Sequence, residues 1–245
     1  DHEKWDTFDT VMSYNDHGKG WNIWFSENDI YALQSIWGRE DDTGDINFFV
    51  ESNKYNIRRT LENDLIIETE LGSENISNIN NIIFKDKVIN IENDIYPIFD
   101  KIEDVNHITG KIFRLYGVIL NRFPDIEGYE FWLNKYQNGE MNLTEIRNSF
   151  ITSTEYQKRF DKEINNYDFL ESIYKEVLKR THDEMGFNYW LEKLNTEVES
   201  KEGVMIHFYN STESINNYDN ALGLSSPILE QISLIEQKQT TNLNL

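Results

Sequence analysis

The chain has 245 residues, no cysteine and a formal net charge of −21 at pH 7. That charge argues against nucleic acid and anionic membrane surfaces as partners, because both require compensating Lys and Arg. The absence of cysteine excludes disulfides and thiol catalysis, and no apolar run reaches the roughly 18 residues that span a membrane. The chain begins Asp1-His2-Glu3 without an initiating Met or a signal peptide, which we interpret as part of a longer precursor.

Residues 1–43 contain a short apolar turn around Met12 and one predicted helix. The helix is expected to begin at Ser26, a candidate N-cap, and to stop at Gly38. Its apolar positions recur at helical spacing: Ile30, Leu33, Ile36 and Trp37.

The runs DTVMSYN and WFSENDIYALQSIWG resemble the end of the catalytic domain in serralysin-like zinc metallopeptidases of the metzincin group. In that family a Met-turn of the form V-M-S-Y follows the zinc helix, and a last helix closes the domain. The resemblance makes Met12 the methionine beneath the metal. It makes Tyr14 the tyrosine that approaches zinc and stabilises the transition state. The other interpretation is a packed methionine and a core tyrosine.

The zinc-binding motif of that family, H-E-x-x-H-x-x-G-x-x-H, is absent from this sequence. None of the five histidines lies four residues from another, so no Lewis-acid metal or activated water is expected in this chain alone. Zinc and peptidase activity are therefore expected only in a longer parent whose zinc helix lies upstream.

Residues 41–48 are predicted to form an acidic linker and a domain boundary. Gly44-Asp45 is at most a fragment of the calcium-binding repeat G-G-x-G-x-D, which leaves calcium as a candidate ligand beside the simpler interpretation of a solvated loop. From 44 to 99, β-branched runs predict a small antiparallel sheet, with strands near 55–57 and 65–69 and a hairpin whose tip is 85–87. The run INNIIFKDKVINI resembles the β segment that joins repeats-in-toxin regions to helical domains in secreted bacterial proteins.

From about residue 96 the chain is predicted to be helical, and it contains a duplication. Each residue of the run from 115 to 133 has its counterpart 58 positions later, from 173 to 191, without a gap. Candidate N-caps at Asp125, Asn142 and Ser153 divide the first copy into about four helices. The predicted fold class is α+β, mainly α, with repeats at about 105–160 and 163–218 in one helical domain, 100–245. An amphipathic helix from Ile228 to Ile235 would end it.

The signature L-Y-x-x-[VI]-L-x-R-x-P-D-x-x-G-x-x-x-W-L, followed by S-x-E-[YF], resembles a bacterial domain of unknown function. That domain is found, often in tandem, in secreted repeats-in-toxin and surface-layer-type proteins. Its Y-x-x-x-L-x-R core is also similar to phycobilisome linker domains. The second copy departs from the signature at His182, where Pro is expected, and at Ser214, where an aromatic residue is expected. We expect both changes to loosen the turn and the last helix.

The repeated motif supplies the candidate binding residues of the helical domain. They are Arg122, Asp125 and Trp132 in the first copy and Arg180, Asp183 and Trp190 in the second. Each Arg–Asp pair either braces its turn or binds an anion or a sugar beside the tryptophan, and repetition in both copies favours bracing. Gly128 and Gly186 are expected to allow close helix approach, and His182 to be a solvated turn residue.

Together these features predict a non-catalytic assembly or adhesion module, secreted or at the surface of a bacterial cell. It would derive from a serralysin-like precursor and act through protein–protein contacts, by self-association or on a cell-surface partner. The alternatives are a fragment of an active zinc endopeptidase and a glycan-binding module.

Overall fold

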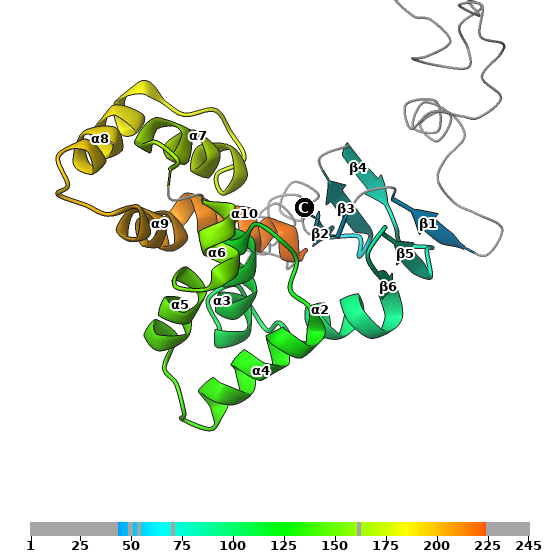
Figure 1. The fold of residues 1–245 in the computed structure, drawn as a ribbon. Coiled ribbons are helices and arrows are strands. Elements are labelled where there is room, and N and C mark those ends of the chain that lie inside the picture. The colour runs from blue at the N-terminus through cyan, green and yellow to red at the C-terminus, as the bar shows by residue number, and fades with distance from the viewer. Residues whose placement is uncertain (1–43, 49–50, 53–54, 70–71, 161–162, 224–245) are drawn as a thin grey trace, which may run out of the picture.

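The computed structural model describes residues 44–48, 51–52, 55–69, 72–160 and 163–223 (Figure 1). The fold is α+β and mainly α, as predicted, with strands between 45 and 90 and helices from Tyr96 onward. The Met-turn, the predicted helix 26–38 and the predicted helix 228–235 lie outside the described residues.

Two three-stranded sheets form the first part of the described chain. An antiparallel meander contains β2 (Tyr55–Arg59), β3 (Leu65–Thr69) and β4 (Gly72–Asn75). The other sheet contains β1 (Asp45–Asn47), β5 (Asn81–Ile83) and β6 (Val88–Asn90). The antiparallel β5–β6 hairpin agrees with the prediction. The prediction of an acidic linker over residues 41–48 is wrong in part. Within this range β1 pairs in parallel with β5 and buries Ile46 opposite Ile82.

Two units of four helices follow, after a π-helical turn, Ile91–Ile95, and α2 (Tyr96–Lys101). The first unit contains α3 (Ile108–Leu115), which continues into a π-helical turn (Tyr116–Leu120), then α4 (Ile126–Gln137), α5 (Leu143–Ile151) and α6 (Thr154–Arg159). The second contains α7 (Asn166–Glu176), α8 (Glu184–Asn195), α9 (Lys201–Asn210) and α10 (Thr212–Leu222). Each helix of the second unit begins 58 residues after its counterpart, so the predicted four-helix repeat is confirmed.

Side-chain caps set these helix starts at the predicted residues. The carboxylates of Asp125 and Asp183 each accept the N–H three residues on, at 2.7 Å. Asn142 forms a capping box with Glu145, and Ser153 accepts the N–H of Tyr156 at 3.1 Å. Each such cap contributes about 1 kcal/mol, so the helix boundaries are encoded locally.

The last helix of each unit also caps the end of its first helix. Arg159 donates from Nη1 to the carbonyls of Val118 and Ile119, at 2.6 and 2.7 Å. At the equivalent position Asn217 donates from Nδ2 to the carbonyl of Leu178, at 3.1 Å. These bonds satisfy carbonyls that a helix end leaves without an intrahelical partner.

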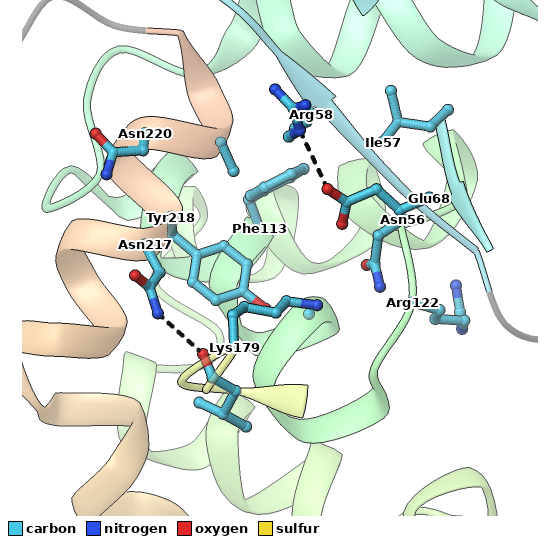
Figure 2. Close-up of a pocket in the computed structure, with 13 residues that line it drawn as sticks. Asn56, Ile57, Arg58, Glu68, Phe113, Arg122, Lys179, Asn217, Tyr218 and Asn220 are labelled. Carbon is cyan, nitrogen blue, oxygen red and sulfur yellow. Dashed lines mark hydrogen bonds and ion pairs between the residues drawn. The ribbon is translucent and has the colours of Figure 1, made fainter. Parts of the chain in front are cut away.

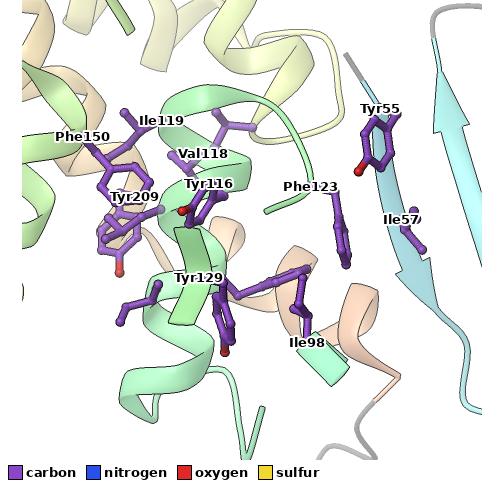
Figure 3. Packing of buried hydrophobic residues seen from close by; sticks show 14 of the residues in the cluster. Tyr55, Ile57, Ile98, Tyr116, Val118, Ile119, Phe123, Tyr129, Phe150 and Tyr209 are labelled. Atoms are coloured by element: carbon purple, nitrogen blue, oxygen red, sulfur yellow. The ribbon is translucent and has the colours of Figure 1, made fainter. Parts of the chain in front are cut away.

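One buried cluster runs from the strands through both helical units, across the predicted boundary at 99/100. Figure 3 shows Phe123 between β2 and the helices of the first unit. Its N–H donates to the carbonyl of Tyr55 at 2.9 Å, and its ring packs against Phe99 and Phe113 at centroid distances of 5.6 Å. The strands and helices therefore share a core.

The expected loosening of the last helix in the second unit is wrong. α10 has 11 residues whereas α6 has six, although Ser214 replaces the aromatic residue Tyr156. The longer helix packs beside β2 (Figure 1). There Tyr218 lies edge-on to Phe113, and Arg59 donates to the carbonyl of Leu222 at 3.1 Å. Contact with the sheet stabilises the additional turns.

The ends of α4 and α8 offer a matched test of backbone strain. Gly139 and Glu197 occupy equivalent left-handed positions, with φ of 70° and 54°. A left-handed residue with a Cβ costs about 1 kcal/mol. We expect Glu197→Gly to raise the free energy of unfolding by about 0.5–1 kcal/mol and Gly139→Ala to lower it by a similar amount. Apart from Gly139 and its two chain neighbours, no residue has an atom within 4 Å of a Cβ at this position, so steric clash does not contribute.

Urea denaturation of the two variants and the unaltered chain measures both changes. A destabilised Glu197→Gly variant would contradict the assignment of strain to this turn.

Candidate functional site

A cluster of five side chains and backbone groups, here called the turn cluster, occurs once in each helical unit. The first consists of Tyr116, Arg122, Asp125, Gly128 and Glu155, and the second of Tyr174, Arg180, Asp183, Gly186 and Glu213. Each cluster joins the end of the first helix, the start of the second and the start of the fourth.

In the first turn cluster, Arg122 is the central group. Its Nε and Nη2 donate to the two carboxylate oxygens of Glu155, the second at 3.1 Å. Its Nη1 donates to Asp125 at 3.3 Å and to the carbonyl of Phe123 at 3.1 Å. The guanidinium carbon lies 5.0 Å from the ring centroid of Tyr116. These contacts hold the turn between the first two helices closed.

The second turn cluster repeats this geometry. Arg180 donates to both oxygens of Glu213, to Asp183 at 3.4 Å and to the carbonyl of Thr181 at 3.0 Å. Its guanidinium carbon lies 5.1 Å from the ring centroid of Tyr174. The agreement of the two copies supports the bracing interpretation of each Arg–Asp pair.

Gly128 and Gly186 were predicted to allow close helix approach, and what each makes room for is a tyrosine side chain of the preceding helix. A Cβ at Gly128 would lie 2.5 Å from the hydroxyl of Tyr116, and one at Gly186 would lie 2.8 Å from the hydroxyl of Tyr174. Burial raises the pKa of both phenols, so each hydroxyl stays neutral. The glycines leave room for a tyrosine over each turn.

Sequence reasoning missed the two glutamates. Glu155 and Glu213 lie 33 residues beyond their arginine partners, so no local spacing pairs them. The available signal was their place in the same S-x-E run of both copies.

Trp132 and Trp190 are half-buried beside the cluster, with ring centroids 5.4 Å from Phe150 and 5.9 Å from Phe208.

His182 is not the solvated turn residue that was expected. Its ring stacks on Phe187 with a centroid distance of 4.0 Å, and its Nδ1 contacts the carboxylate of Glu171. His182 is the counterpart of Pro124 in the first copy. Because its imidazole is planar, it can stack on the ring of Phe187.

Groups of candidate metal ligands and membrane-spanning helices are both absent from the described part of the chain. Across 44–223, apart from the undescribed gaps, no group of three or more His, Asp or Glu side chains could hold a metal ion. Met12 and Tyr14, the residues that resemble those of a zinc peptidase, lie outside this part. None of the described helices is long and apolar enough to cross a bilayer.

A cavity of about 310 Å³ lies where the β2–β3 hairpin meets α3, the end of α7 and α10 (Figure 2). Its apolar walls include Ile57, Phe113 and Tyr218. Its polar lining residues are Asn56, Arg58, Glu68, Arg122, Lys179, Asn217 and Asn220. Sequence reasoning could not find this cavity, because its walls come from four segments far apart in the chain.

Comparison with known families gives a match within the helical region. Residues 111–160 and 147–218 match the family described as "Domain of unknown function (DUF4214)". The repeats match a domain of unknown function. No curated protein and no solved structure matches the chain. The predicted tandem domain of unknown function is thus supported, whereas the resemblance of residues 1–43 to serralysin-like peptidases stays a prediction.

The two turn clusters predict different costs for the same substitution. The side chain of Arg122 is 19% exposed and that of Arg180 is 38% exposed, so solvent screens the second ion pair more. We expect Arg122→Gln to lower the free energy of unfolding by about 1–3 kcal/mol and Arg180→Gln by about 0.2–1 kcal/mol. Urea unfolding of both variants measures the difference, and a larger loss at Arg180 would contradict the bracing account.

The second turn cluster also predicts a pH dependence. The hydrogen bond from the N–H of Gly186, with Arg180 nearby, holds the pKa of Asp183 below its usual value. A lowered folded-state pKa stabilises the fold above the unfolded pKa, and this contribution is lost as the pH falls through the folded value. The loss therefore lies below about pH 4.

Asp183→Asn keeps an N-cap residue but removes the titration. We expect the variant to lose less stability than the unaltered chain between pH 5 and pH 2, in roughly the range where carboxylates titrate, as measured by urea unfolding. Identical acid profiles would show that Asp183 contributes nothing to the pH dependence.

Proposed function

We propose that the chain is a non-catalytic assembly module that self-associates through protein–protein contacts, outside a bacterial cell or at its surface. The carrying observation is a pair of exposed aromatic rings at equivalent positions of the two helical units. Phe131 on α4 is 49% exposed and Tyr189 on α8 is 53% exposed. Exposed aromatic anchors are enriched at protein interfaces.

Each exposed ring is held in a fixed geometry. Phe131 and Tyr189 lie edge-on to the tryptophan that follows them, at centroid distances of 4.9 and 5.0 Å. The ammonium of Lys135 lies 5.5 Å from the ring of Phe131, and Lys193 repeats this contact at Tyr189. Because the rings are already positioned, docking a partner costs little side-chain entropy.

The repetition gives one chain two contact faces of the same chemistry. Two linked faces allow avidity, since binding at one raises the effective concentration at the other. In each turn cluster the arginine and both carboxylates are paired with one another, which supports a scaffold role for the Arg and Asp residues. The resemblance of the repeats to domains of secreted bacterial proteins supports the proposed location.

The finer part of this proposal is parentage from a serralysin-like peptidase precursor. It is supported by the Met-turn run with Met12 and Tyr14 and by the run that resembles the last helix of that family. Digestion of casein by the natural precursor, abolished by a zinc chelator, is the expected result for an active parent. Digestion that persists in chelator would contradict a zinc enzyme.

Self-association is tested by light scattering of the full chain at increasing concentration, with and without calcium. We expect reversible oligomers whose dissociation constant rises about tenfold or more in Phe131→Ser/Tyr189→Ser, because aromatic anchors dominate interface energy. The dissociation constant of each single variant should lie between that of the unaltered chain and that of the double variant. Met185→Ser is the matched control, since Met185 is 83% exposed on α8 but has no repeated counterpart.

A strict monomer at every concentration would overturn the proposal. Equal weakening by Met185→Ser would also contradict it, because the effect would then not belong to the repeated rings.

A further inference from the structure

The cavity at the junction of sheet and helices opens beside a second hollow of about 580 Å³. The two share the lining residues Asn56, Glu68 and Lys179, so they lie side by side. We call these two adjoining hollows the junction groove. Ligand pockets of small molecules start at about 300 Å³, so its inner cavity accepts one small molecule.

Charge in the junction groove is opposite to that of the chain. Glu68 is paired with Arg58 at 3.1 Å, and Glu176 is paired with Arg159 at 2.6 Å. Lys175 and Lys179 also line the groove, and within the described residues neither forms a salt bridge. Two uncompensated cations in a chain of charge −21 make the groove a local attractor for an anionic group.

The backbone conformation of Lys179 indicates that this lysine is not there to stabilise the turn. Lys179 is left-handed, with φ of 56°, and its counterpart in the first unit is Asn121, with φ of 53°. Asparagine tolerates this conformation, whereas a lysine there is strained. The turn itself gains nothing from lysine, but the groove gains an ammonium group (Figure 2).

The remaining walls suit a ligand with both apolar and hydroxyl surfaces. Tyr218 offers a ring, and it fits because Gly117 opposes it: a Cβ there would lie 2.1 Å from its hydroxyl. Asn56 lines the same cavity and carries a side-chain amide. Amide groups both donate and accept hydrogen bonds, as hydroxyl groups do, and an aromatic face covers the C–H face of a sugar ring.

We propose that the junction groove binds a sugar acid. The ammonium groups of Lys175 and Lys179 hold the carboxylate. Asn56 hydrogen-bonds the ring hydroxyls, and Tyr218 contacts the apolar face of the ring. This site is separate from the exposed rings of α4 and α8, so its binding does not depend on self-association.

Ligand-observed NMR titration of the full chain at low salt tests the site with D-glucuronate, D-glucose and acetate. We expect glucuronate to bind about tenfold or more tightly than either control, because it alone combines the charge and the ring. Glucose that binds as tightly as glucuronate would overturn the role of the lysines. Acetate that binds as tightly would overturn the sugar class, and no binding of glucuronate would overturn the site.

Lys179→Asn supplies the decisive variant, since it imports the residue of the first unit and relieves the strained turn. We expect it to weaken glucuronate binding about fivefold or more without lowering the thermal midpoint. Lys158→Gln, on the exposed face of α6, should leave binding unchanged. Equal affinity of Lys179→Asn and the unaltered chain would place the ligand elsewhere and overturn the proposal.

Discussion

The guanidinium group at the centre of each turn cluster is the contact on which the helical units depend. Arg122 joins three helices because it bonds Glu155 and Asp125 together and lies on the ring of Tyr116. A planar group with five donors can meet these partners at once, whereas a lysine could not. The same arrangement around Arg180 explains why two units of different sequence hold their first turn in the same geometry.

The two units differ most where they meet the sheet. Phe123 of the first unit bonds to β2 and fills the space between sheet and helices. In the second unit α10 is longer than its counterpart and reaches β2, where it places Tyr218 against Phe113. The junction groove exists because of this asymmetry, since its walls combine α10, α3 and the β2–β3 hairpin.

The protein therefore has two kinds of surface, one that is repeated in both helical units and one that occurs only where the units meet the sheet. The exposed rings of Phe131 and Tyr189 occur in both units and suit a contact made twice. The junction groove occurs once in the described chain and carries Lys179, where the first unit has Asn121. A module of this kind can combine multivalent protein contacts with one small-molecule site.

The sequence by itself determined the four-helix repeat, its N-caps, its tight glycines and the β5–β6 hairpin. These follow from local rules: a side chain caps a helix three residues away, and a duplication shows directly in the register. Sequence reasoning did not foresee the pairing of β1 with β5, the packing of His182 on Phe187, the glutamates of the turn clusters or the junction groove. Apart from His182 and Phe187, which are five residues apart, these join groups far apart along the chain, so only the tertiary structure decided them.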